Sequence, residues 1–344
     1  MKKTVLIVGS AVLASSFAST AFARDGISVV GSSTVYPFAT VVAERFGKTT
    51  DFNTPKIEST GSGGGFKLFC SGIGVETPDI TNSSRRMKTS EFEQCQNNGV
   101  TDITEVLIGY DGIAVANSVN ATQFDMSTKD LYLALAKMVP NPDGSENLIE
   151  NPYVQWSDVN PALPAIDIEV LGPPPTSGTR DAFAELAMEG GCSQFEFIEN
   201  MESAAHKAAC HTMREDGAYV EAGENDNLIV QKLEANPDAL GIFGFSFLEQ
   251  NSDKVQSSII DGFTADFDAI ADGDYSISRP LYFYVKTQHV GTVPGISEYL
   301  AEFTSEQAWG EDGYLVDKGM IPLGDEERNA VGTAVKNMEK LVLN

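Results

Sequence analysis

The hydrophobic positions of this chain predict short buried strands, each followed by a polar turn and an amphipathic helix. Short apolar runs occupy residues 27–30 and 166–171, and residues 56–60 and 79–82 also read as strands. After residues 166–171, apolar residues within 182–187 recur with helical spacing. Strands that alternate with helices are typical of α/β domains with largely parallel sheets. The pattern therefore predicts an α/β protein.

Two longer strand patterns divide the chain. Residues 104–117 form an apolar run that Asp111 and Gly112 interrupt, and residues 278–285 form a second such run. Two crossover strands of this kind predict two lobes, with a ligand enclosed in the cleft between them. We assign residues 24–110 and 285–344 to lobe 1 and residues 111–284 to lobe 2.

Four strands are each followed by a turn rich in hydroxyl groups, glycine or arginine. The turns are residues 31–34, 61–65, 83–86 and 177–180. The free N–H groups and the positive dipole end of a helix N-terminus favour a bound anion. A serine or threonine in such a turn is also an ordinary helix cap, so one turn alone would decide nothing. Four turns of one design indicate an anion-binding cleft.

The turns differ in how they begin a helix. Thr34 is expected to cap a helix that extends to about residue 46. The glycine run at 61–65 is expected to be a turn before a short helix that starts at Phe66. In the fourth turn, Gly178 lets the backbone approach an anion closely, and Arg180 offers two parallel donors.

The N-terminus reads as an export signal. A basic pair at residues 2–3 precedes an apolar stretch at 4–17 and a small-x-small cleavage site at 21–23. We expect residues 1–23 to be a signal peptide that is cleaved before Arg24. A transmembrane anchor is the weaker alternative because the apolar stretch is too short to span a bilayer. No cysteine precedes Cys70, so we expect a free periplasmic protein without a lipid anchor.

The charge of the chain limits the kinds of molecule that we expect it to bind. The formal net charge of the 344 residues is −26, and cleavage of the two leader lysines makes it −28. So acidic a surface argues against nucleic acid and against anionic membranes as partners. It does not exclude a small anion, because a buried site is governed by local dipoles and nearby charges. We expect a monomer.

Four cysteines fit an oxidising compartment and allow three disulfide connectivities. A zinc site built from Cys192, Cys210, His206 and His211 is the alternative, but the spacing matches no standard zinc motif. Two local disulfides are favoured, namely Cys70–Cys95 and Cys192–Cys210.

Seven short motifs occur in order along the chain. They are Gly31-Ser-Ser-Thr-Val-Tyr-Pro, Thr60-Gly-Ser-Gly-Gly-Gly, Ser83-Ser-Arg, Tyr110-Asp-Gly-Ile-Ala-Val, Trp156-Ser-Asp-Val-Asn-Pro, Ser177-Gly-Thr-Arg and Arg279-Pro-Leu-Tyr-Phe-Tyr-Val. Each is weak singly, but the ordered set resembles the phosphate-binding proteins of bacterial high-affinity phosphate ABC transporters. The resemblance implies a type II periplasmic binding-protein fold, inorganic phosphate as ligand, and docking on the transmembrane permease subunits of an ABC transporter.

The resemblance also implies phosphate contacts from both lobes. They are Thr34, the Val35 N–H, Ser62, Ser177, the Gly178 N–H and Thr179. The predicted set is completed by Ser33, Ser84, Arg85, Asp111 and Arg180. Some members of the family have an arginine where Pro173 stands; here Arg85 and Arg180 are expected to supply the positive charge, as in the Ser-Gly-Thr-Arg branch.

Asp111 is our candidate for the group that distinguishes phosphate from sulfate. Some members of the family place an aspartate where Ser84 stands, and that aspartate accepts the proton of hydrogen phosphate. An acid inside an apolar run is unfavourable unless it is paired. We expect Arg85 or Arg180 to keep Asp111 ionised. The alternative is that Asp111 only caps a bend at Gly112.

Other functions fit the sequence less well. A secreted hydrolase acting on phosphate esters would need a serine, a histidine and an acid that converge, or metal ligands. The Gly-x-Ser-x-Gly motif is absent, and none of the three histidines accompanies a polar turn. We therefore expect no enzyme, no metal and no cofactor. A binding protein for another oxyanion, such as sulfate, is the remaining alternative.

Overall fold

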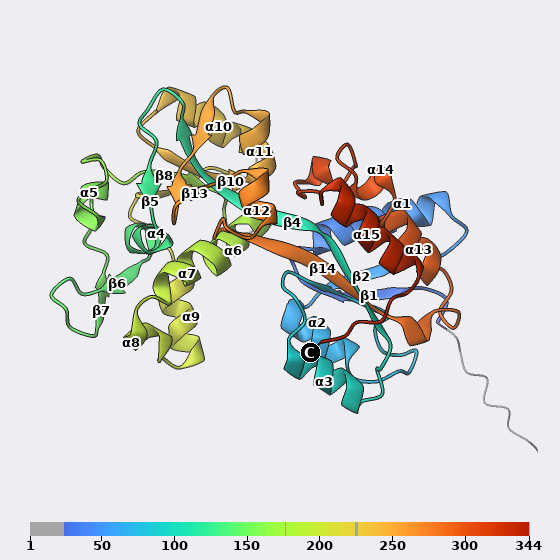
Figure 1. Ribbon diagram of the computed structural model, residues 1–344. Coiled ribbons are helices and arrows are strands. Elements are labelled where there is room, and N and C mark those ends of the chain that lie inside the picture. Colours follow the sequence, from blue (N-terminus) through green and yellow to red (C-terminus); the bar gives the residue numbers. More distant parts are fainter. Residues whose placement is uncertain (1–23, 176, 224–225, 344) are drawn as a thin grey trace, which may run out of the picture.

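The computed structural model describes residues 24–175, 177–223 and 226–343, and it has two lobes joined by two long strands (Figure 1). The arrangement confirms the predicted two-lobed α/β fold. Strands β4 (Ile103–Ser118) and β14 (Ser278–Lys286) are the two crossover strands, and they pair antiparallel. The signal peptide predicted at residues 1–23 lies outside the described residues.

One sheet runs through both lobes. Its strand order is β2-β1-β3-β14-β4-β10-β8-β9, and β11 also pairs with β4. Strands β1, β2 and β3 pair parallel in lobe 1, and β8, β9 and β10 pair parallel in lobe 2. The seven strands besides β4 and β14 are β1 (Ser28–Gly31), β2 (Lys56–Ser59), β3 (Ile80–Ser83), β8 (Val170–Gly172), β9 (Tyr219–Glu221), β10 (Leu240–Gly244) and β11 (Val255–Ser257).

Helices cover the sheet in each lobe (Figure 1). Lobe 1 contains α1 (Tyr36–Thr49), α2 (Ser62–Phe69), α3 (Thr89–Asn97), α13 (Ile296–Phe303), α14 (Glu306–Trp309) and α15 (Asp325–Lys336). Lobe 2 contains α4 (Thr128–Leu135), α5 (Trp156–Val159), α6 (Gly178–Phe183), the π-helical turn η1 (Ala184–Met188), α7 (Glu189–Cys192), α8 (Glu196–Glu199), α9 (Ser203–His211), α10 (Asp226–Ala235), α11 (Phe245–Gln250) and α12 (Phe267–Ala271). Within the described ranges, no helix has the length and apolar composition needed to cross a bilayer.

Lobe 2 also contains short strands outside the main sheet. They are β5 (Asp125–Met126), β12 (Ile259–Ile260) and β13 (Phe263–Thr264) in one small sheet and β6 (Met138–Pro140) and β7 (Leu148–Glu150) in a hairpin. The lobe boundaries that we placed between residues 110 and 111 and between 284 and 285 fall inside β4 and β14. Both strands continue through these positions without a break. The structure therefore marks no residue at which one lobe ends and the other begins, and the boundaries stay a prediction.

Helix α2 corrects the expected start of the second helix. It begins at Ser62 rather than at Phe66, so the glycine run forms its first turns. A Cβ atom on Gly65 would lie 2.6 Å from the Cα atom of Gly31 and 2.5 Å from Oγ1 of Thr81. Gly65 is therefore needed because α2 packs directly on β1 and β3 at this position, which places Ser62 at the ends of these strands.

Helix α1 corrects the expected cap. Val35, not Thr34, occupies the N-cap position, and its N–H makes a long 3.4 Å contact with Oγ of Ser32. The helix buries Phe38, Val42 and Phe46, each four residues from the next, in the core of lobe 1. Thr34 is thereby released from capping, and its hydroxyl serves the cleft described below.

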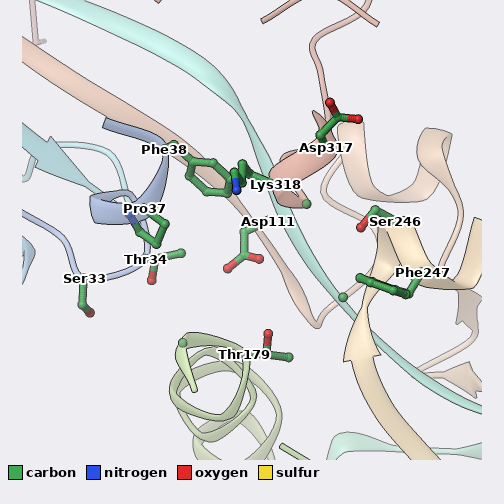
Figure 2. A pocket seen from close by; sticks show the side chains of 13 residues that line it. Ser33, Thr34, Pro37, Phe38, Asp111, Thr179, Ser246, Phe247, Asp317 and Lys318 are labelled. Atoms are coloured by element: carbon green, nitrogen blue, oxygen red, sulfur yellow. The ribbon is translucent and has the colours of Figure 1, made fainter. Parts of the chain in front are cut away.

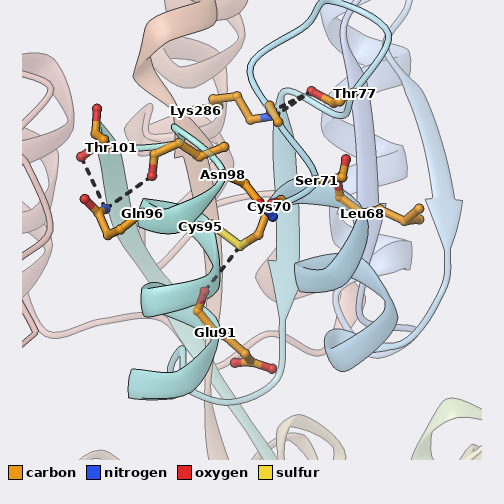
Figure 3. Close-up of a disulfide and its surroundings, with 12 residues drawn as sticks. Leu68, Cys70, Ser71, Thr77, Glu91, Cys95, Gln96, Asn98, Thr101 and Lys286 are labelled. Carbon is orange, nitrogen blue, oxygen red and sulfur yellow. Dashed lines mark hydrogen bonds between the residues drawn. A yellow bond between two sulfur atoms is a disulfide. The ribbon is translucent and has the colours of Figure 1, made fainter.

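The two disulfides have the favoured local pairing. Cys70, which follows α2, is joined to Cys95 of α3 (Figure 3), and Cys192 of α7 is joined to Cys210 of α9. The amide of Asn98 donates to the carbonyl of Cys70 at 2.7 Å and further ties α3 to this segment. Because the sulfurs of Cys192 and Cys210 are bonded to each other, they are not thiolate ligands, and the zinc alternative fails at this position.

Beside the second disulfide, His206 and His211 both contact Glu189, at 2.6 and 2.8 Å. The hydrogen bond with the Glu189 carboxylate raises the pKa of His206 above its ordinary value of 6.5, although burial opposes the shift. A raised folded-state pKa means that this contact stabilises the protein fully below pH 6.5 and is lost as the pH rises through the folded value.

Replacing His206 should therefore have a pH-dependent cost. His206→Gln is expected to lower the melting temperature more at about pH 6 than at about pH 8.5. Thermal unfolding of both proteins in matched buffers measures the difference. An equal loss at the two pH values would contradict the assignment, because it would show that packing rather than charge explains the effect.

Candidate functional site

A cleft of about 350 Å³ lies between the lobes (Figure 2). We call it the central cleft. Lobe 1 contributes the turn after β1 and the start of α1, β4 contributes Asp111, and lobe 2 contributes the start of α6 together with residues at the start of α11. Its lining consists of Ser33, Thr34, Pro37, Phe38, Asp111, Gly178, Thr179, Gly244, Ser246, Phe247, Asp317, Lys318 and Gly319.

The Ser-Gly-Thr turn forms the lobe 2 wall of the central cleft. Ser177 is the N-cap of α6, and its Oγ accepts a hydrogen bond from the N–H of Thr179 at 3.2 Å. A Cβ atom on Gly178 would meet no heavy atom within 4 Å, so the backbone at Gly178 faces open space. Figure 2 shows Thr179 across the cleft from Thr34 and Asp111. The predicted residues of the first and fourth turns thus face one another.

The second and third turns meet in an adjoining depression that we call the side hollow. Oγ of Ser62 lies 3.3 Å from Oγ of Ser84 and accepts the backbone N–H of Ser84 at 3.2 Å. The lining of the side hollow is Ser62, Gly63, Ser84, Arg85, Arg86, Glu185, Leu186, Arg279 and Pro280. The structure therefore brings the second and third turns together in the side hollow, whereas the first and fourth turns meet in the central cleft.

The two arginines that we expected to hold the anion are engaged by other groups. Arg85 makes a bidentate ion pair with Glu91, with N–O distances of 2.7 and 2.9 Å. Arg180 lies over the ring of Tyr219, 4.3 Å from its centroid, and donates to the carbonyl of Pro173 at 3.2 Å. Arg85 still lines the side hollow, whereas the guanidinium of Arg180 is directed at lobe 2 itself.

Arg279, which the sequence indicated only as the first residue of a motif on the second crossover strand and not as a site residue, is the guanidinium at the centre of the site. Its side chain is 8% exposed. Nη2 donates to Oγ1 of Thr34 at 2.6 Å, Nη1 contacts Oε2 of Glu185 at 2.6 Å, and Nε contacts Oδ2 of Asp111 at 3.3 Å. Arg279 thus contacts lobe 1, lobe 2 and the crossover strand at once.

The partner of Asp111 is therefore Arg279, and the expectation that Arg85 or Arg180 would fill this role is wrong. Arg279 and Asp111 are direct neighbours in the β14–β4 register, a pairing that is defined only once the two crossover strands are aligned. Burial raises the pKa of Asp111 above its ordinary value, while the charge and hydrogen bond of Arg279 oppose the rise. The expected bend at Gly112 is also displaced, because the glycine with a positive φ on β4 is Gly109, at 150°.

The three histidines lie away from the central cleft. His206 and His211 contact Glu189, and His289 makes a 2.6 Å contact with the buried Asp79. Among the described residues, none of the cleft-lining side chains is a histidine. A serine in the turns therefore has no histidine base within the site, which removes the basis for hydrolysis by a Ser-His pair.

Comparisons with known proteins show the family of this chain. A family profile described as the PBP superfamily domain matches residues 17–307. The phosphate-binding protein PstS of Staphylococcus haemolyticus is 30% identical over 281 residues, which cover 80% of this chain and 75% of the relative. The protein of the same name from Staphylococcus saprophyticus is 29% identical over 279 residues, covering 78% and 73%.

The fold has solved counterparts. The crystal structure of a possible phosphate binding protein from Planctomyces limnophilus superposes with a TM-score of 0.72 at 24% identity, over 92% of this chain and 99% of that chain. At this identity the likeness shows the fold alone. The family profile and the staphylococcal relatives lead to one conclusion: the chain belongs to the PBP superfamily and, within it, to the family of phosphate-binding proteins PstS.

Proposed function

We propose that this protein binds one inorganic phosphate ion in the central cleft and delivers it to the permease of an ABC transporter for import. The observation that carries the proposal is the convergence of polar turns from both lobes on Arg279, whose donors contact Thr34, Asp111 and Glu185. The phosphate-binding protein PstS relatives support phosphate as the ligand. Members of this family bind substrates and are not enzymes, so we assign no reaction.

The proposed contacts follow from the site. Hydroxyl groups and N–H groups of Ser33, Thr34, Gly178 and Thr179, which line the central cleft, contact the ion there. Ser177 and the N–H of Val35, the adjoining residues of the same two turns, complete the proposed set. From the side hollow, Ser62 and Ser84 supply further hydroxyl groups, and Arg85 supplies positive charge. Arg279 joins the set as the principal cation, and Arg180 supports the turn from behind through Tyr219. Lys318, exposed on the rim of the central cleft, adds a further positive charge to attract the ion.

The proposed setting is the periplasm, with cleavage before Arg24, no lipid anchor and a monomeric protein. Support comes from the side chain of Arg24, which pairs with Asp79 and donates to the carbonyls of Gly26 and Thr77. The chain is thus part of the lobe 1 structure from residue 24 onward. Mass spectrometry of the exported protein tests the cleavage site, since a first residue other than Arg24 would contradict it.

Titration calorimetry tests the ligand. One phosphate ion per chain is expected to bind, and the ion should be recovered unchanged after denaturation. Sulfate at large excess is expected to compete poorly. A protein that binds sulfate as tightly as phosphate would support the other-oxyanion alternative, and release of alcohol from a phosphate ester would support the hydrolase alternative.

A further inference from the structure

Glu185 lies on the helix that begins at the Ser177 cap. Residues 178–192 form one continuous helix in which the π-helical turn η1 separates α6 from α7, and Glu185 belongs to η1. π-Helical turns are rare and often occur at functional sites. Here the turn carries the carboxylate that meets Arg279, with Oε2 of Glu185 2.6 Å from Nη1.

The three partners of Arg279 are not equally fixed. Asp111 is its register neighbour on the paired crossover strand, with only 16% of its side chain exposed. Thr34 is held in the turn before α1. Glu185 reaches Arg279 from lobe 2, and 52% of its side chain is exposed. Half-exposed ion pairs are weak because water competes for both charges. Glu185 is therefore the partner that leaves Arg279 most readily.

The Glu185–Arg279 pair also stands where the ligand must pass. Thr34 and Asp111 line the central cleft, whereas Glu185 lines the side hollow with Ser62. Arg279 contacts residues of both linings. An anion that contacts both sets of hydroxyl groups has to lie against Arg279, so it meets the negative charge of Glu185 at close range.

We propose that Glu185 is a specificity-determining residue: its carboxylate occupies the Nη1 donor of Arg279 as a built-in competitor, and phosphate displaces it on binding. The inference rests on the function proposed above. Every anion must then replace an existing ion pair, and only an anion that makes further good contacts does so. The charge of Glu185 also disfavours sulfate, which carries two negative charges, more than dihydrogen phosphate, which carries one.

The test is Glu185→Gln, compared with the unchanged protein by titration calorimetry with phosphate and with sulfate. Release of a half-exposed ion pair and loss of a like charge should tighten phosphate binding by about three- to tenfold. Sulfate binding should tighten by a larger factor. Glu189→Gln is the matched control, because it makes the same change of charge one turn further along the helix, where Glu189 contacts His206 and His211.

Each outcome decides the matter. Tighter binding of both anions in Glu185→Gln, with Glu189→Gln unchanged, supports the proposal. Unchanged binding in both variants overturns it and leaves a solvated ion pair. Weaker phosphate binding in Glu185→Gln also overturns it, since Glu185 would then be a direct ligand. If the unchanged protein does not bind phosphate, the proposed function fails first and this inference falls with it.

Discussion

Arg279→Ala is expected to weaken phosphate binding at least about a hundredfold. Hydrogen bonds to charged groups contribute about 1.5–3 kcal/mol each, and loss of two such bonds corresponds to two or more orders of magnitude in affinity. The substitution also removes the positive charge that faces Asp111 and Glu185. Both carboxylates would then repel the incoming anion without compensation.

Calorimetry on matched arginine variants separates the roles. Arg180→Ala removes the contacts with Tyr219 and Pro173 and should reduce affinity by less than about tenfold, the effect of one weakened turn. Arg279→Lys should not restore binding, because one ammonium cannot reproduce the planar fork that reaches three partners. Arg45→Ala, which removes a cation over the ring of Tyr314, controls for loss of an arginine elsewhere in lobe 1.

The opposite pattern would be equally informative. If Arg279→Ala still binds within tenfold of the unchanged protein while Arg180→Ala loses most of its affinity, Arg180 must turn from Tyr219 into the cleft on binding. The role first predicted for Arg180 would then be correct, and Arg279 would be a structural residue of the crossover strands.

The elements of this fold were predictable because their signals are local. The strand-like runs that became β1, β2 and β3 are short and are each followed by a polar or glycine-rich turn, and the runs that became β4 and β14 are longer than these strands. The disulfide Cys70–Cys95 also follows from short sequence separation, 25 residues. In each case the evidence lies within a short stretch of sequence.

The predictions that were wrong concern residues whose conformation or role depends on tertiary contacts. Gly65 looked like part of a loop, but it is helical because the backbone of Gly31 lies against it. Thr34 looked like a cap, but its hydroxyl accepts from Arg279, which lies 245 residues away in sequence. No window of the chain contains both partners of either contact.

Arg279 shows most clearly that local sequence does not reveal tertiary contacts. Arg85 and Arg180 stand beside glycine and serine in obvious turns, yet each is held by a neighbour, Glu91 or Tyr219. Arg279 begins one of the seven motifs, but it stands in a strand and outside every polar turn, so its local sequence does not mark it as a site residue. Its signal is the strand register, which sets it against the acid in the other crossover strand, and register is settled only when the lobes assemble.

The second large effect is expected for Asp111→Asn. Near neutral pH, phosphate carries at least one proton and sulfate carries none, so an ionised carboxylate in the site accepts the phosphate proton and repels sulfate. The Asn variant offers a donor in place of that acceptor. Phosphate binding should weaken about ten- to a hundredfold, and the preference for phosphate over sulfate should fall by about a hundredfold or more.

The pH dependence gives this prediction its sharpest form. Burial raises the pKa of Asp111 against the opposing influence of Arg279, so its carboxyl takes up a proton at a higher pH than an ordinary aspartate. In the unchanged protein, sulfate should begin to compete as the pH falls toward this raised value, whereas in Asp111→Asn sulfate competes at every pH. Asp143→Asn, in an exposed loop of lobe 2, makes the same change of charge and should leave both curves unchanged. If Asp111→Asn folds normally and still excludes sulfate at large excess, Asp111 serves only to hold Arg279, and a second carboxylate must accept the phosphate proton.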